Sequence, residues 1–358
     1  MSMPEGFRSK GESKSRVCRL LKSLYDLKQA SRQWSLKLTE ALVDNGYIQS
    51  LHDYSLFTKV KGDKIVLLHI YVDDLLITGN DGEMVVELKG ILHLNFKMND
   101  LGHLKYFLGI EVIHSKEGIV VHQKKYALEL IADLGPGGAR CASTPLEQNA
   151  KYTTANYDKQ VHGNTIDRML EDVTVYQRLI GRLLYLTHTR LDITFAVQHL
   201  SQFMQAPKKV HYEAVLRIVR YVRQYPGQGI FLSASSKLVL NAYCDLDWAS
   251  CLMTRRSVTG YCIKLGDSLI CSKSKKQNIV SRSSVEAKYR CMASIVAELV
   301  WLKGLIEELG IKHEIPAALF CGNQAALQIA ANLVFHERTK HIEIDCHFMR
   351  EKIQKGVV

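Results

Sequence analysis

The chain has 358 residues, which is enough for two or three domains with more than one core. Its 47 Lys and Arg exceed its 36 Asp and Glu, giving a formal net charge of +11, so a polyanionic partner such as nucleic acid is favoured. Nine cysteines without a C-x-x-C pair argue against a disulfide framework or zinc ribbon. No signal peptide and no apolar run near ~20 residues is found, so we expect no membrane partner and a cytoplasmic or nuclear location.

The first elements predicted are a helix and a hairpin tipped with two acids. Residues 29–44 have helical apolar spacing and stop at Asn45-Gly46. Two apolar runs, 65–72 and 75–77, then meet at Asp73-Asp74, which predicts a tight hairpin. Adjacent carboxylates repel each other and persist most easily against a divalent cation, normally Mg²⁺ in phosphoryl transfer. The alternative is a solvent-exposed acidic turn.

The next block completes an α+β pattern. Asp81 is placed to cap a helix, residues 106–114 and 118–122 predict a second hairpin, and residues 123–133 predict a short helix. Helix, hairpin, helix, hairpin and helix in succession indicate an antiparallel sheet covered on one face. We expect this region to span residues 1–142.

A polar stretch, residues 143–172, follows the glycine-rich break at 135–138 and is interpreted as a connecting segment. Residues 175–224 are then predicted to be helical throughout. Arginines on one of these helices either follow a phosphate backbone or form a solvated polar face, namely Arg217, Arg220 and Arg223. The connecting and helical region is expected to occupy residues 143–235.

The remainder, residues 236–358, predicts a mixed sheet with helices packed against it. The expected strands are 238–244, 257–265, 269–272 and 318–321. The expected helices are 284–309, 324–332 and 347–354.

Several dense motifs in this order resemble the reverse transcriptase and ribonuclease H part of copia-type long-terminal-repeat retrotransposon polyproteins, and the resemblance covers nearly the whole chain. They are Ser23-Leu24-Tyr25-Asp26-Leu27-Lys28-Gln29-Ala30-Ser31-Arg32-Gln33-Trp34, Asp53-Tyr54-Ser55-Leu56-Phe57, Tyr71-Val72-Asp73-Asp74 continuing into Ile77-Thr78-Gly79-Asn80-Asp81, Leu104-Lys105-Tyr106-Phe107-Leu108-Gly109-Ile110-Glu111, Tyr185-Leu186-Thr187, Thr254-Arg255-Arg256-Ser257-Val258-Thr259-Gly260-Tyr261 and His336-Glu337-Arg338-Thr339-Lys340-His341. The resemblance implies a partial polymerase palm, a helical thumb or connection region, and a ribonuclease H-like mixed-sheet α/β domain lacking its last helix.

The resemblance also implies roles for the acids. Asp73 and Asp74 match the Mg²⁺ ligands of the polymerase palm. Two-metal nucleotide transfer needs a further carboxylate, which the family carries upstream of Pro4-Glu5-Gly6-Phe7, so we expect the third acid and the fingers to be absent from this chain.

The ribonuclease H half departs from the family's four metal-binding carboxylates. Asp245 matches the first, but Lys288 stands where the second is expected, with Glu286 an alternative assignment for that position. Gly322 replaces the third, and the fourth is expected beyond Val358. An ammonium in place of a carboxylate repels the cation, so this site is expected to bind Mg²⁺ weakly at best.

The expected partner is an RNA/DNA hybrid or single-stranded nucleic acid, held by basic and polar residues of the motifs: Lys28, Gln29, Arg32, Arg255, Arg256, Lys273, Lys275, Lys276, Arg338 and Lys340. We therefore expect a catalytically defective reverse transcriptase and ribonuclease H fragment that at most binds nucleic acid. The alternatives are an enzyme active only when completed by missing segments, a regulatory partner of an intact element polymerase, and a decayed reading frame.

Overall fold

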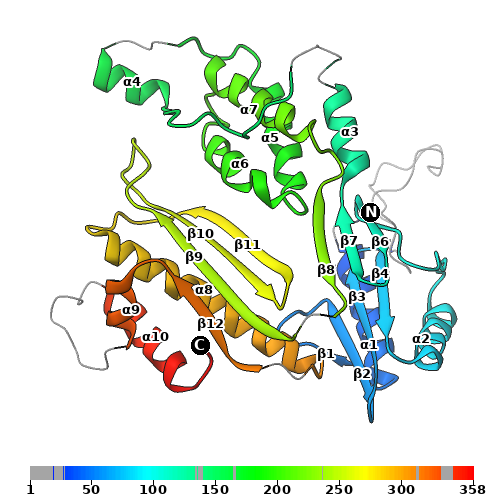
Figure 1. Ribbon diagram of the computed structural model, residues 1–358. Coiled ribbons are helices and arrows are strands. Elements are labelled where there is room, and N and C mark those ends of the chain that lie inside the picture. The colour runs from blue at the N-terminus through cyan, green and yellow to red at the C-terminus, as the bar shows by residue number, and fades with distance from the viewer. Residues whose placement is uncertain are drawn as a thin grey trace, which may run out of the picture. The chain divides into compact units, whose positions relative to one another are not determined.

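A computed structural model describes residues 19, 27, 29–133, 135, 140–163, 167–235, 237–311, 314–331 and 342–358 (Figure 1). By contacts, the chain divides into two compact units. The first comprises Met1–Asp100 and Glu307–Gly310, and the second comprises Leu101–Ile306 and Ile311–Val358. Each unit is a mixture of helices and predominantly antiparallel sheets, as the sequence predicts.

The first unit is a four-stranded antiparallel sheet with strand order β1-β2-β3-β4. Its elements are α1 (Ala30–Asp44), β1 (Ile48–Gln49), β2 (Leu56–Lys61), β3 (Lys64–Tyr71), β4 (Asp74–Gly79) and α2 (Gly82–Asn95). Leu38 of α1 and Leu88 of α2 are fully buried in one cluster with Val66 and Leu68 of β3. Because alternate strand residues point to opposite faces, these positions bring one face of the sheet against the helices. The predicted first helix and acidic hairpin are confirmed.

The cap of α2 follows the sequence expectation. The Asp81 carboxylate accepts the Met84 backbone N–H at 2.9 Å, which satisfies one of the donors that a helix start leaves open. Lys64 Nζ also lies 2.6 Å from Asp81 Oδ2. The hydrogen bond from Lys64 and that from Met84 hold the Asp81 pKa below its ordinary value.

The second predicted hairpin is present but belongs to another sheet. It consists of β5 (Tyr106–Phe107), β6 (Ile110–His114) and β7 (Gly118–His122), and β7 pairs with a strand that the sequence reading missed, β8 (Gly229–Ser233). Gly229 is required there, since a Cβ would lie 2.2 Å from the Val121 carbonyl oxygen. This pairing assigns the hairpin to the second unit, so the compact units divide after Asp100, whereas the sequence places the first boundary at residue 142.

A helical region follows, as predicted for residues 175–224. It contains α3 (Lys124–Asp133), α4 (Ala155–His162), α5 (Val173–Leu186), η1 (Leu191–Ile193), α6 (Thr194–Ser201) and α7 (Lys209–Val222). Tyr176, Ile180 and Leu183 of α5 share a buried cluster with Val215 and Ile218 of α7. The segment expected to be a polar connection, residues 143–172, contains one short helix, α4, that the sequence does not predict.

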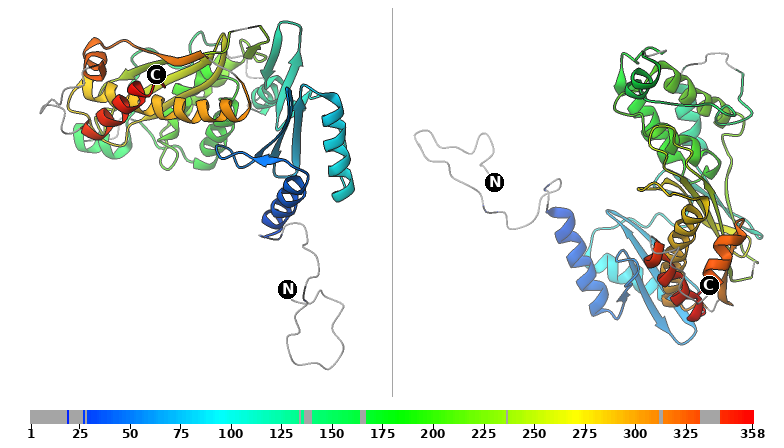
Figure 2. Two further views of the ribbon diagram at one scale, coloured as in Figure 1. Left: turned by 90° about the horizontal axis from the view of Figure 1, so that it is seen from below. Right: turned by 90° about the vertical axis from the view of Figure 1, so that its left-hand side faces the viewer.

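The last part of the chain forms the predicted mixed sheet, with strand order β11-β10-β9-β12. Its strands are β9 (Val239–Asp247), β10 (Val258–Leu265), β11 (Ser268–Lys276) and β12 (Glu314–Cys321), and only the β9–β12 pair is parallel among the described strands. The helices α8 (Ser284–Glu308), α9 (Gln324–Ala331) and α10 (Glu343–Gln354) share its buried cluster (Figure 2). None of the helices in the described ranges combines the length and apolar character needed to cross a membrane.

A buried polar cluster joins α4 to the start of α7. Lys208 Nζ lies 2.7 Å from Asp158 Oδ2, and both residues are 4% exposed. The Thr153 hydroxyl donates to Asp158 Oδ1 at 2.5 Å. His211 is fully buried, and its Nδ1 accepts the Lys208 backbone N–H at 3.0 Å, which requires the ring to be neutral there. Burial and the nearby Lys208 charge lower the His211 pKa to about 4.

The depressed pKa of His211 predicts acid lability within a narrow pH range. The unfolded chain binds a proton near pH 6.5 and the folded chain only near pH 4, so the free energy of unfolding falls as the pH drops between these values. We expect a loss of roughly 2–3 kcal/mol between pH 7 and pH 4.5, measured by urea unfolding.

The His211→Gln variant, neutral at every pH, should lose most of this dependence, whereas the exposed His103→Gln control should keep it. An unchanged pH dependence in His211→Gln would contradict the assignment.

Candidate functional site

The acidic hairpin presents its two carboxylates to solvent. Tyr71 at the end of β3 pairs with Asp74 at the start of β4, leaving Val72 and Asp73 as a two-residue turn. The side chains of Asp73 and Asp74 are both exposed. Val72 has φ = 51°, a left-handed conformation that a β-branched residue adopts only at a cost. Close strand pairing therefore holds the turn in a strained shape, with the exposed Asp73 in the turn and the exposed Asp74 at the first position of β4.

A polar cluster holds the end of β3 next to this turn. Ser55 donates its backbone N–H to Asp53 Oδ1 at 2.9 Å, and its Oγ lies 3.0 Å from His69 Nε2 on β3. The Ser55 carbonyl accepts the Ile70 N–H at 2.9 Å. Burial raises the Asp53 pKa, but the hydrogen bonds from Ser55 outweigh it and hold that pKa below its ordinary value. The second motif of the sequence thus fixes β3 just before the acidic turn.

The hairpin fits part of a magnesium site. Mg²⁺ takes one or two protein carboxylates and completes its octahedron with water and substrate phosphates, which Asp73 and Asp74 can accommodate. Within the described ranges, no group of three or more His, Cys, Asp and Glu side chains is placed to hold a metal. The two acids therefore need further ligands.

The second set of predicted site residues lies at one end of the β9–β12 sheet. Lys288 Nζ, on α8, donates to Asp245 Oδ1, on β9, at 2.7 Å. The lysine side chain is 7% exposed and the carboxylate side chain 93% exposed. Burial acts to lower the Lys288 pKa, but the hydrogen bond and charge of Asp245 raise it, and the same bond lowers the Asp245 pKa. The carboxylate of the pair therefore faces solvent, whereas the ammonium approaches it from the buried side of α8.

The positions expected to carry the other acids are also resolved. Cys321 on β12 is in register with Cys244 on β9, so Gly322 follows the strand beside Asp245. A Cβ at Gly322 would meet no heavy atom within 4 Å, leaving room for a side chain. Glu286 faces elsewhere, accepting the Arg282 backbone N–H at 2.9 Å and lying 3.2 Å from Arg290 Nη2. The side chain that reaches Asp245 is therefore that of Lys288.

The C-terminal helix brings one more acid toward this region. Asp345 on α10 lies 3.6 Å from Arg290 Nη1, so Arg290 joins it to Glu286. Burial raises the Asp345 pKa. The fourth acid that the resemblance places beyond Val358 stays a prediction.

The predicted nucleic-acid-binding residues that the structure describes belong to both units. Arg255 and Arg256 precede β10, and Val258 pairs with Lys276 at the end of β11, so these basic residues gather at one end of the strand pair. Lys273 lies over the Tyr261 ring, and Lys275 is exposed. Gln29 and Arg32 are exposed at the start of α1 in the other unit. Lys28, Arg338 and Lys340 lie outside the described residues.

Two of the predicted cations have structural partners. Lys276 Nζ donates to Gln202 Oε1 at 2.9 Å, which ties β11 to the end of α6. Arg217 donates to the Thr144 carbonyl at 3.2 Å and to the Thr144 hydroxyl at 3.1 Å. These contacts favour a packing role for Arg217 over the phosphate-tracking alternative.

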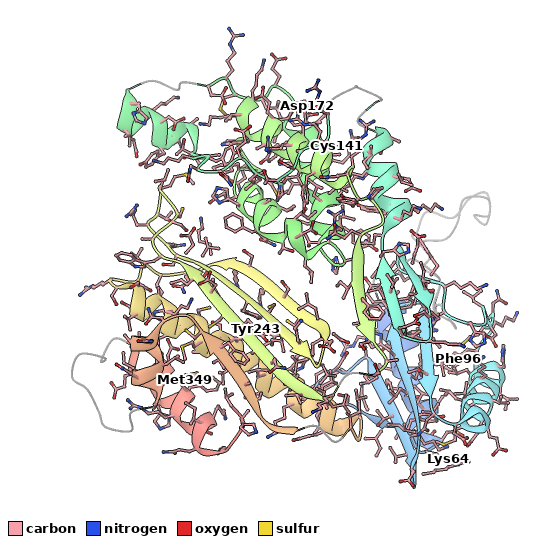
Figure 3. All side chains as sticks on the ribbon, in the orientation of Figure 1. Lys64, Phe96, Cys141, Asp172, Tyr243 and Met349 are labelled. Carbon is pink, nitrogen blue, oxygen red and sulfur yellow. The ribbon has the colours of Figure 1, made fainter. Side chains whose placement is uncertain are left out.

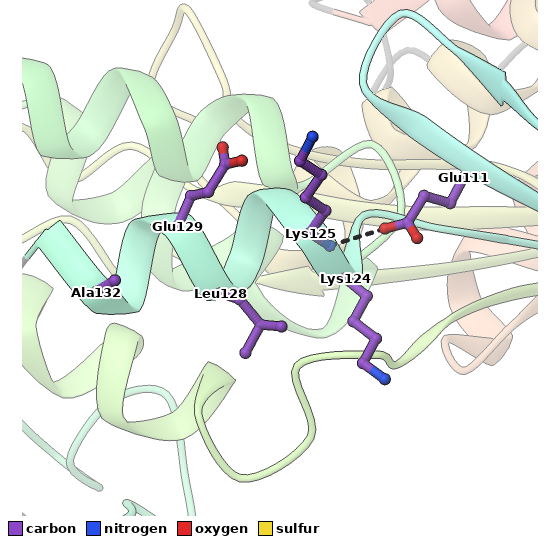
Figure 4. A pocket seen from close by; sticks show the side chains of 6 residues that line it. All are labelled: Glu111, Lys124, Lys125, Leu128, Glu129 and Ala132. Carbon is purple, nitrogen blue, oxygen red and sulfur yellow. Dashed lines mark hydrogen bonds between the residues drawn. The ribbon is translucent and has the colours of Figure 1, made fainter.

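An open hollow of about 460 Å³ lies beside α3 (Figure 4). Its lining mixes charges and apolar groups: Glu111, Lys124, Lys125, Leu128, Glu129 and Ala132. Glu111 Oε1 accepts the Lys125 backbone N–H at 2.7 Å, which helps to start the helix. Glu111 is the last residue of the motif that begins at Leu104, and the other lining residues lie outside the motifs.

Sequence reasoning missed one exposed feature near Asp245. Tyr243 on β9, labelled in Figure 3, stacks on Phe320 of β12 with ring centroids 4.9 Å apart. Tyr243 lies two residues before Asp245, so strand alternation places both on one face. The parallel register that brings Phe320 beside Tyr243 has no local sequence signal.

The matches to known proteins agree with these motifs. Residues 1–148 match the family described as reverse transcriptase (RNA-dependent DNA polymerase). The whole chain is 40% identical to the retrovirus-related Pol polyprotein from transposon RE1 of Arabidopsis thaliana, covering 24% of that protein. It is 34% identical over 99% of its length to the Pol polyprotein from transposon TNT 1-94 of Nicotiana tabacum, covering 26% of it. No solved structure matches.

The chain is thus a reverse transcriptase-family protein. Within that family it belongs to the retrovirus-related Pol polyproteins of copia-type retrotransposons. It spans about a quarter of the length of these Pol relatives. A shorter relative, the uncharacterized mitochondrial protein AtMg00810 of Arabidopsis thaliana, is 38% identical over 65% of this chain and 93% of its own length.

The strained turn predicts that Val72→Gly stabilises the hairpin locally. Glycine relieves the left-handed strain but adds unfolded-state freedom, so the net gain should be about 1 kcal/mol or less. Hydrogen–deuterium exchange of the β3 and β4 amides should slow up to about fivefold.

The matched control is Gly62→Ala in the neighbouring β2–β3 turn, where φ is +62°. This change should have the opposite sign. Faster exchange in Val72→Gly would show that the valine is not strained.

Proposed function

We propose that this chain is a nucleic-acid-binding member of the reverse transcriptase family whose β9–β12 domain is a ribonuclease H-like domain that holds an RNA/DNA hybrid without cleaving it. The observation that carries this proposal is the 2.7 Å pair between Lys288 Nζ and Asp245 Oδ1. The family resemblance places a second acid at Lys288 and a third at Gly322.

Charge decides how such a site meets a phosphate. Acids at positions 245, 288 and 322 would carry three negative charges and bind a phosphodiester only through cations. Here Asp245 and Lys288 cancel and Gly322 is neutral, so the summed charge is zero. A unit-charge pair at ~4 Å is worth about 4 kcal/mol at an effective dielectric of 20, enough to remove the repulsion of an incoming phosphate.

The residues at this end of the sheet do not fit magnesium. Lys288 fills the space beside Asp245 with a cation of its own, and Gly322 offers no ligand. No hydrolytic step is therefore derived through a metal here. Asp245, Lys288 and Gly322 together carry no net charge and are flanked by the basic residues near β10 and β11. This arrangement suits binding of a phosphate backbone without its hydrolysis.

The proposal predicts hybrid binding that survives metal removal. The full chain should bind an RNA/DNA hybrid equally well with Mg²⁺ and with EDTA, and its affinity should fall steeply with salt. Lys288→Glu places two acids together, so binding in EDTA should weaken by roughly tenfold and recover in part on addition of Mg²⁺. Fluorescence anisotropy with a labelled hybrid measures both effects.

Two variants serve as controls. Lys303→Glu makes the same charge change on the same helix, about 22 Å further along, beyond a Debye length, and should alter affinity little. Lys288→Met separates loss of the ammonium from gain of an acid and should give an intermediate affinity. Cleavage of the hybrid by the unmodified chain in Mg²⁺, or binding that requires Mg²⁺, would overturn the proposal.

A second candidate function is RNA-directed DNA polymerisation, favoured by the solvent-facing pair Asp73 and Asp74 on their fixed hairpin. In this function the two acids would hold Mg²⁺, which supplies charge stabilisation to the transferring phosphoryl group. The hairpin's own part is to keep both carboxylates beyond the end of β3, where a primer end and nucleotide can reach them.

The two candidates predict different results for Asp73→Asn combined with Asp74→Asn. If the chain only binds nucleic acid, affinity in EDTA should stay unchanged or rise slightly, because two phosphate-repelling charges are gone. Asp63→Asn in the neighbouring turn is the control. Magnesium-dependent primer extension by the unmodified chain, abolished in the double variant, would establish the polymerase function, and absence of extension would refute it for this chain.

A further inference from the structure

The sheet of strands β11, β10, β9 and β12 packs one face on helices. Among the described helices, none covers the other face above the pair of β9 and β12. Ala242 and Cys244 of β9 and Leu319 of β12 belong to the cluster shared with α8. The alternate residues Tyr243 and Phe320 point the other way and are 42% and 50% exposed. Helix α6 reaches this domain at the opposite flank, through Gln202 and Lys276 of β11.

Tyr243 and Phe320 form an ordered aromatic unit on this face. They are register partners on adjacent parallel strands, and their rings lie 4.9 Å apart with an interplanar angle of 13°. Neither belongs to the buried cluster, so the pair does not complete the core. Two rings stacked in parallel and half-exposed present flat π surfaces at low conformational-entropy cost.

The neighbouring positions on the same face are small. Cys262 of β10 is the cross-strand partner of Tyr243. The next positions on the same face are Ala318 of β12, opposite Asn241, and Gly260 of β10, opposite Asp245. Ser272 of β11, the partner of Cys262, is a further small residue on this face. Small, uncharged side chains therefore surround the two rings, which leaves room for a planar group beside them.

The charge around this surface favours a polyanion. Lys264 of β10 is the cross-strand partner of Asn241, which lies two residues before Tyr243 on the same face, and it contributes a positive charge. Asp245, on the other side of Tyr243, is balanced by Lys288 at 2.7 Å. Asp247, exposed two residues further along β9, lies in the row of Val258, whose β11 partner is Lys276, so a lysine on the same face matches its charge. Lys264 is left as the excess positive charge, and a ligand that combines planar rings with phosphate charges meets both features.

We propose that Tyr243 and Phe320 form a base-stacking platform for single-stranded nucleic acid on the open face of the β9–β12 sheet. An open four-stranded sheet with exposed aromatics on adjacent strands is a surface on which splayed bases stack, while nearby lysines attract the backbone. The bases of a duplex stack on each other and offer no free face to such rings. This platform deepens the proposed nucleic-acid binding, because it adds a preference for unpaired strands.

The test compares single-stranded and hybrid ligands on the full chain. Tyr243→Ala and Phe320→Ala should each weaken binding of a labelled oligonucleotide of about ten nucleotides on the order of tenfold, and should change hybrid binding much less. Tyr243→Phe keeps the ring and should keep the affinity. Phe231→Ala removes a Phe that is 47% exposed on β8 and should have no effect.

A second readout reports stacking itself. An oligonucleotide containing 2-aminopurine should lose fluorescence on binding to the unmodified chain and regain it with Tyr243→Ala. Circular dichroism checks that each variant folds, and Tyr243→Leu offers a second ring-free variant if the alanine form does not.

The outcomes separate this inference from the proposed function. Retained hybrid binding, with no effect of either aromatic substitution on single strands, would overturn the platform alone. Failure of the unmodified chain to bind the hybrid would refute the proposed function, while ring-dependent binding of single strands would still support the platform. Equal losses for single strands and hybrid would also overturn the platform as a reader of unpaired bases.

Discussion

The pair between Lys288 and Asp245 determines how the C-terminal domain can act. The Lys288 side chain is largely buried between α8 and β9, and the Asp245 carboxylate 2.7 Å away offsets the cost of placing its charge there. Removing Asp245 would leave a buried charge without its partner, and removing Lys288 would expose phosphate to an unbalanced acid. The same contact therefore has two effects. It holds the start of α8 against β9, and it brings the summed charge of positions 245, 288 and 322 to zero.

The acidic hairpin in the first unit shows the opposite design. Within the described part of the chain, neither Asp73 nor Asp74 forms an ion pair, and the strained Val72 places Asp73 in the turn and Asp74 at the first position of β4. Strain at such a turn costs stability, and β3 offsets it by pairing on both sides, with β2 and with β4. The hairpin in the first unit thus carries two negative charges, whereas at Asp245 the charge of the carboxylate is neutralised by Lys288 of the same chain.

Much of the fold can be predicted from the sequence because its elements bury periodic apolar residues. The hairpin of β3 and β4, the cap Asp81, the long helix α8 and the mixed sheet all follow from local patterns, and all are present. β8 was missed because its five residues are only half buried and its partner β7 lies more than a hundred residues away. The helix α4 was missed because its stability comes from Asp158 and Lys208 rather than from an apolar stripe.

The candidate sites divide in the same way. Motifs identify Asp73, Asp74, Asp245 and Lys288 by position, but only tertiary packing shows which side chain reaches Asp245 and that Glu286 does not. The aromatic pair depends wholly on the parallel register of β12 against β9, a pairing between distant segments that no local pattern specifies. Tyr243 and Asp245 occupy consecutive positions on one face of β9, with Phe320 of β12 beside the first and Lys288 of α8 bonded to the second. If Tyr243 and Phe320 bind unpaired bases as we propose, the neutral pair of Asp245 and Lys288 leaves no unbalanced carboxylate beside them on β9 to repel the phosphates of the bound strand.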